Sequence, residues 1–137
     1  MRRMPSLFVL LAMLWLGGCA TNQRSDLLTT TLNAYASAIR WGDVDGAIEF
    51  IDPAQRAAHP VGKPYLERYK QIRVSEYDEG NGPVPAGQNE VRQIVHISLI
   101  DNDTQSERSI IDRQTWRYDT EKKHWWLTSG LPEINPN

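Results

Sequence analysis

Cysteine is almost absent from this chain of 137 residues, which contains only Cys19. No disulfide can form within the chain, so the fold must be held together by packing alone. Histidine is also scarce, and His59, His96 and His124 lack the close spacing of metal ligands. The sequence has no glycine-rich phosphate loop and no serine nucleophile elbow. We therefore expect no cofactor and no metal.

A strong charge of either sign is also missing. The chain has 15 lysines and arginines against 17 aspartates and glutamates, a net charge of −2. Without Arg2 and Arg3 it would keep 13 basic and 17 acidic side chains, a net charge of −4. A mildly acidic domain has no basic surface for the phosphate backbone. We therefore expect no nucleic acid partner.

One apolar run stands out, and it lies near the start of the chain. Arg2 and Arg3 precede an unbroken apolar stretch from Leu7 to Leu16, and Gly17 and Gly18 follow it. The stretch is too short for a membrane-spanning helix, which needs about 20 residues. A basic start, a short apolar run and small residues are the three parts of a signal peptide. The sequence therefore predicts that residues 1–18 are cleaved.

The residues Leu16-Gly17-Gly18-Cys19 resemble the lipobox of bacterial lipoproteins. The resemblance implies transfer of a diacylglycerol to the Cys19 sulfur, cleavage before Cys19 and acylation of the new amino group. Several acyl chains on one residue give stable anchoring, which a single chain does not. Ala20 is not the aspartate that resembles an inner-membrane retention signal, which implies the outer membrane, periplasmic face. The alternative is an ordinary secretory peptide, although no A-x-A-type site follows the apolar run.

The remaining chain is long enough for one domain. Cleavage of residues 1–18 from 137 would leave 119. We expect residues 19–24 to be a lipidated N-terminus and short tether, whose last five residues reach less than ~18 Å. Residues 25–130 then form a single α+β domain. Residues 131–137 contain two prolines and are expected to be a loose tail.

Apolar residues recur at helical spacing in the first part of this domain, whereas apolar and polar residues alternate in the second part. Apolar residues such as Leu28, Leu32 and Ile39 predict a helix that Ser25 caps and that ends at Gly42. Asp43 and Asp52 can cap two shorter helices. Alternating patterns predict strands over residues 71–77, 90–100, 108–118 and 124–129. Helices followed by a strand meander are an α+β order.

Two local patterns suggest a family. The tight break between helices at 41–47 and the aromatic closing hairpin of 116–118 with 125–127 resemble the nuclear transport factor 2-like superfamily, also called the ketosteroid isomerase-like or cone fold. The resemblance covers most of residues 25–130. It implies N-terminal helices packed on a curved antiparallel sheet, a pocket in the cone and frequent dimerisation through the sheet's outer face. The superfamily's catalytic residues match no positions here, so the resemblance implies no activity.

Polar residues interrupt the sheet face that should carry the core. A two-residue turn at Asn102-Asp103 would place Gln93 opposite Asp112 on that face. Buried polar groups need partners, since an unpaired one costs about 1–3 kcal/mol. A register shifted by one residue would instead turn Asp112 to solvent, and Arg113 or a helix residue could also satisfy it. The candidate pocket residues are Tyr35, Gln93, Asp112 and Gln114.

The opposite face is more apolar than a solvated face should be. Arginine and tryptophan are enriched at protein interfaces, which favours a subunit or partner surface. Partial cover by the chain's own tail is the alternative. The candidate interface residues are Ile94, His96, Ile111, Arg117 and Trp126.

These observations lead to two functional hypotheses. The first is a membrane-anchored periplasmic lipoprotein that acts as a non-catalytic binding or assembly module, either as a homodimer or on an envelope protein partner. The second is a small-ligand-binding protein or isomerase/hydrolase-like enzyme that uses the cone pocket around Asp112. A cavity lined by Asp112 would support the second, and an exposed patch around Ile94, Ile111 and Trp126 the first.

Overall fold

The computed structural model describes the backbone of residues 6–135 and the side chains of residues 21–135. Helices precede strands along the chain, so the α+β class expected from the sequence is confirmed. The elements in chain order are α1 (Ser6–Arg40), α2 (Val44–Ile48), α3 (Pro53–Ala58), α4 (Lys63–Tyr69), β1 (Ile72–Asp78), β2 (Val84–Gly87), β3 (Glu90–Asp101), β4 (Glu107–Asp119) and β5 (His124–Leu127).

The first helix is much longer than the sequence predicted. It begins at Ser6 rather than at Ser25, so residues 20–24, expected as a tether, are helical. The apolar run is rich in leucine, which favours helix, and no proline separates it from the helix expected after Ser25. Residues 1–5 of the expected signal peptide and the Cys19 side chain lie outside the described residues. No helix in the described part of the chain is long and apolar enough to cross a bilayer.

Side-chain caps fix the two short helices that follow. The Asp43 carboxylate accepts a hydrogen bond from the Gly46 N–H at 2.9 Å, and the Asp52 carboxylate accepts one from the Ala54 N–H at 2.8 Å. Both caps were expected from the sequence, because aspartate satisfies the free N–H groups of a first helical turn. A further helix, α4, has Pro64 in its first turn.

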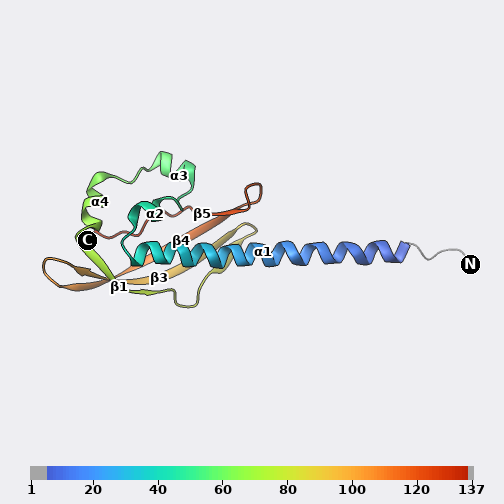
Figure 1. Ribbon diagram of the computed structural model, residues 1–137, viewed down its shortest axis with the longest axis horizontal. Coiled ribbons are helices and arrows are strands. Elements are labelled where there is room, and N and C mark those ends of the chain that lie inside the picture. The colour runs from blue at the N-terminus through green and yellow to red at the C-terminus, as the bar shows by residue number, and fades with distance from the viewer. Residues whose placement is uncertain (1–5, 136–137) are drawn as a thin grey trace, which may run out of the picture.

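The strands form one antiparallel sheet in the order β1-β3-β4-β5, and β2 also pairs with β3. Strand β2 was not expected, since glycine and proline dominate its surroundings. It pairs with the start of β3, whereas β1 pairs with the end of β3. The sheet is curved, and α1 crosses one of its faces (Figure 1).

The register of β3 against β4 differs by two residues from the sequence prediction. Gln93 pairs with Gln114, not with Asp112, whose partner is Val95. The turn is longer than expected: the Asp101 N–H donates to the Ser106 carbonyl at 3.0 Å across residues 102–105. A shift of two residues leaves every side chain on its original face, because side chains alternate with period two. The predicted inner and outer faces are therefore confirmed.

The core lies between the inner face of the sheet and the helices. Tyr35 of α1 packs edge-on against Trp116 of β4, with ring centroids 5.2 Å apart. The expectation of a loose C-terminal tail is wrong for residues 131–134. Ile134 is buried, and the Tyr65 hydroxyl donates to the Pro132 carbonyl at 2.9 Å. Residues 136 and 137 lie outside the described residues.

Candidate functional site

The inner face of the sheet carries a buried polar network centred on Gln114. Its amide nitrogen donates to the Asp112 carboxylate at 2.8 Å and to the Tyr77 hydroxyl at 2.9 Å. Its amide oxygen accepts hydrogen bonds from the Trp116 indole N–H at 3.1 Å and from the Gln93 amide at 3.4 Å. One side chain thus satisfies polar groups from three strands.

Asp112 is a carboxylate held away from water. Burial raises its pKa to about 6, and the hydrogen bond from Gln114 only partly offsets that rise. Tyr35 lies in the same region: burial, and then the Asp112 charge, raise the pKa of its hydroxyl. Neither the Tyr35 hydroxyl nor the Gln93 amide oxygen has a hydrogen-bond partner in the described structure.

The four candidate pocket residues are therefore brought together, but of the four only Gln93 lines one of five surface hollows in the described structure. Tyr35, Asp112 and Gln114 are absent from the linings of these five hollows. Nor do the described residues include a group of three histidines, cysteines or carboxylates able to hold a metal. A ligand-binding or catalytic role for the network stays a prediction that no cavity supports.

The outer face carries the most exposed aliphatic side chains of the sheet. Val84 is 59% exposed, Ile94 51% and Ile111 56%. Val84 opposes Arg92, and Ile111 opposes His96. On β3, Arg92 lies two positions before Ile94 and His96 lies two positions after it. All three therefore lie on one face, because side chains two apart on a strand share a face. We call this surface the outer patch, made of Val84, Arg92, Ile94, His96, Ile111 and Arg113.

A hollow of about 460 Å³ adjoins the outer patch. Its lining combines the loop after β1 with the exposed surfaces of β2 and β3, namely Gly80, Asn81, Gly82, Val84, Arg92, Gln93, Ile94 and His96. Gly80 and Gly82 both have positive φ, which glycine adopts without strain. The loop can therefore turn sharply beside the sheet and form one wall of the hollow.

The charges around the outer patch are mixed: it contains Arg92 and Arg113, and the exposed Asp78 of β1 opposes His96. Arg113 opposes Ile94 and is exposed, with no ion pair or hydrogen bond in the described structure. The exposed Arg92 pairs only with Glu90, which is half-buried, at 3.2 Å. A surface pair of this kind contributes little, about 0–1 kcal/mol, and leaves the guanidinium available. The patch is an apolar centre bordered by charges of both signs, among which Arg113 has no partner in the described structure.

Two of the predicted interface residues lie apart from this patch. Arg117 pairs with Trp126, and both lie near the β4–β5 turn. Arg117 forms an ion pair with Asp52, and this contact lowers the pKa of the Asp52 carboxyl. Trp126 is half-buried and packs against the His124 ring at 4.0 Å between centroids. All five predicted interface residues therefore lie on the outer face, with Arg117 and Trp126 at one end of it, while Val84 was missed because β2 itself was not expected.

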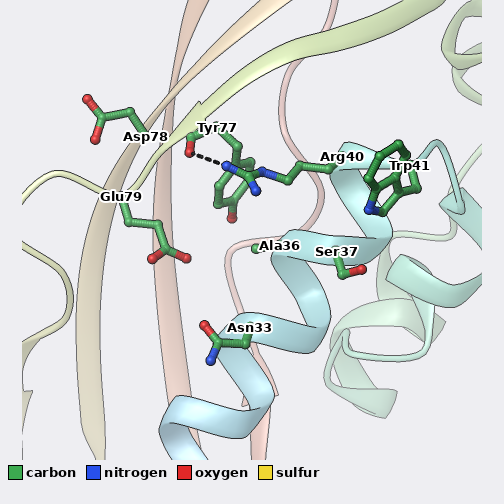
Figure 2. Close-up of a pocket in the computed structure, with 8 residues that line it drawn as sticks. All are labelled: Asn33, Ala36, Ser37, Arg40, Trp41, Tyr77, Asp78 and Glu79. Atoms are coloured by element: carbon green, nitrogen blue, oxygen red, sulfur yellow. Dashed lines mark hydrogen bonds between the residues drawn. The ribbon is translucent and has the colours of Figure 1, made fainter.

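A second hollow, of about 270 Å³, separates the end of α1 from β1 (Figure 2). Its walls are mostly polar, and the Arg40 guanidinium lies across it to donate to the Tyr77 carbonyl at 3.3 Å. Trp41, 84% exposed, stands at its rim. Arg40 thus covers a carbonyl of strand β1, which has only β3 as a sheet neighbour.

Comparison with known proteins relates the chain to solved structures only. No protein-family model matches it, and no curated protein does. A solution structure of a SEC-C motif containing protein from Rhodopseudomonas palustris is similar with a TM-score of 0.54 and 17% identity, covering 78% of this chain and 76% of that one. A SEC-C motif containing protein from Psychrobacter arcticus gives a TM-score of 0.47 and 10% identity, over 74% of this chain and 58% of the other.

These findings correct the identification drawn from the sequence. The similar structures are SEC-C motif containing proteins, not nuclear transport factor 2-like cone domains, and neither is described as a lipoprotein. At 17% identity the likeness shows the fold alone: helices packed on a curved antiparallel sheet. The tight break after α1 and the aromatic hairpin are both present in the structure, so these two local patterns do not distinguish the two kinds of protein.

Proposed function

We propose that this protein is a non-catalytic binding module, held at the outer membrane by a lipid on Cys19, that binds another envelope protein through the outer patch. The exposed Val84, Ile94 and Ile111 beside the hollow of about 460 Å³ support this role most strongly. A folded domain gains nothing from three exposed aliphatic side chains on one sheet face, whereas a partner surface does.

The rim charges favour a partner other than a second copy of this chain. A symmetric dimer through the patch would bring Arg92 and Arg113 of one copy close to the same residues of the other, and like charges in contact oppose association. Arg92 is already paired with Glu90, and the exposed Asp78 opposes His96, but Arg113 has no partner of its own. The proposed partner surface is therefore apolar at its centre and carries a carboxylate where it meets Arg113.

Substitution of the patch should weaken binding without unfolding the domain. Ile94→Thr/Ile111→Thr keeps β-branched side chains but removes apolar area, and loss of such anchors weakens binding by about tenfold or more. Recovery of the partner after chemical cross-linking of intact cells measures the effect, with Arg73→Thr on β1 as a matched exposed control. Equal recovery from the double variant and the control would contradict the proposal.

The membrane anchor is proposed from the residues around Cys19, since the comparisons do not bear on it. Replacement of Cys19 by serine removes the sulfur that would receive the diacylglycerol. We expect Cys19→Ser to abolish incorporation of radiolabelled palmitate and, because no A-x-A-type site after the apolar run offers another cleavage, to leave residues 1–18 attached to the protein. Continued labelling of the serine variant would overturn the anchor.

A further inference from the structure

At one end of the domain, Arg24 of α1 forms hydrogen bonds and cation–π contacts with the sheet. Its guanidinium donates to the Gln88 carbonyl at 2.8 Å and to the Asn89 amide oxygen at 3.1 Å. The same guanidinium lies over the Tyr118 ring at 4.4 Å and the Trp125 ring at 5.2 Å. The Trp125 indole N–H in turn donates to the Arg24 carbonyl at 3.2 Å.

These contacts join α1 to the two turns at that end of the sheet. Asn89 belongs to the β2–β3 turn, and its carbonyl accepts a hydrogen bond from the Tyr118 N–H at 2.7 Å. Tyr118 and Trp125 flank the β4–β5 turn and pair with each other across it. Both turns lie where α1 leaves the domain, and the turn at residues 102–105 lies at the opposite end (Figure 1). The packed domain therefore begins at Arg24.

From this geometry we infer that the β2–β3 and β4–β5 turns face the phospholipid headgroups, with the turn at residues 102–105 pointing away from the membrane. The inference rests on the proposed lipid at Cys19. Only four residues separate Cys19 from Arg24. The two Cα atoms are then about 8 Å apart if α1 stays helical, and at most ~18 Å apart if it does not.

The short connection, and not charge, sets this orientation. The β4–β5 turn carries exposed Glu121, Lys122 and Lys123, and the Asp119 carboxylate accepts hydrogen bonds from the N–H groups of Glu121 and Lys122 at 3.0 Å. These charges nearly cancel, so the turn has no strong attraction for anionic lipid. The orientation is therefore expected to be the same on neutral and anionic vesicles.

The orientation also limits where the protein that binds the outer patch can be located. Ile94 lies four residues along β3 from Glu90, which is about 13 Å at 3.3 Å per residue. Ile111, on β4, opposes His96, which lies six residues along β3 from Glu90, or about 20 Å. The outer patch thus stands within a few nanometres of the bilayer, where the protein that binds it must also reach. A partner that is itself attached to the membrane meets this requirement.

Energy transfer to the membrane tests the orientation. The full lipidated protein is placed in phosphatidylethanolamine/phosphatidylglycerol vesicles that contain a headgroup-labelled acceptor lipid. A donor dye is attached to Lys122→Cys in one sample and to Asp103→Cys in another, both exposed positions. Because β3 alone spans about 36 Å, we expect transfer at least about twofold greater from position 122 than from position 103.

Lengthening the connection supplies the control. Insertion of ten glycine and serine residues after Ala20 frees the domain to reorient and should bring the two transfer efficiencies together. Equal or reversed transfer in the uninserted, vesicle-bound protein would overturn the orientation while leaving the anchor intact. A protein that carries no lipid and does not float with the vesicles would instead overturn the anchor, and the orientation with it.

Discussion

Gln114→Leu is expected to destabilise the protein by at least about 3 kcal/mol. Leucine fills most of the space but can neither donate to Asp112 and Tyr77 nor accept from Trp116. Each buried polar group left without a partner costs about 1–3 kcal/mol. The losses are not fully additive, because the groups share one network. Urea unfolding followed by tryptophan fluorescence measures the change in the free energy of unfolding.

A second substitution shows whether the network or the volume of Gln114 matters. In Asp112→Asn/Gln114→Leu, the buried group at position 112 that has lost its donor is an amide and not a carboxylate. A neutral amide costs less to bury than a charged carboxylate. We therefore expect the double variant to be less destabilised than Gln114→Leu alone. A Gln114→Leu protein as stable as the original would show that the network contributes nothing to the fold.

Asp112→Asn is expected to stabilise the protein at neutral pH and to remove part of its pH dependence. The folded pKa of Asp112 is raised from 3.8 to about 6, so the folded state holds the proton more tightly than the unfolded state. The contribution of Asp112 to stability is therefore greatest below pH 3.8 and is lost as the pH rises to about 6. A shift of about two units corresponds to about 3 kcal/mol.

The difference between the two proteins isolates this effect. Other carboxyls, such as those of Asp52 and Asp101, have lowered pKa values and contribute stability that is lost as the pH falls. Their contribution is common to both proteins and cancels. The advantage of Asp112→Asn should grow between pH 4 and pH 6 and level off above that range, as urea unfolding across this range would measure. An advantage that does not change with pH would show that Asp112 titrates normally.

The sequence predicted the faces of the sheet better than its register. Alternation along β3 and β4 placed Gln93, Asp112 and Gln114 on the inner face, where all three are buried. The pairing was wrong by two residues because the turn after Asp101 could be read as two residues or as four. Local sequence sets which face a side chain takes, whereas the turn sets its partner.

Other differences come from tertiary contacts that local patterns do not contain. Strand β2 pairs with β3, with Val84 opposite Arg92, although glycine and proline surround Val84 in the sequence. Residues 131–134 are held by contacts with Tyr65 and Arg108, far away in the sequence. The Arg24 contacts are of the same kind, since their partners lie more than 60 residues later. A polar residue in the expected tether gave no sign of them.

The proposed function depends most on the outer patch, and site-specific photo-cross-linking tests it most directly. A photoreactive amino acid is placed at Ile94, in the patch, and at Asn102, an exposed control in the distant turn. Irradiation of intact cells is expected to give a discrete adduct with a membrane-attached protein from position 94, and that adduct should disappear with Ile111→Thr. Adducts of equal yield and pattern from both positions, or no adduct from position 94, would contradict the account.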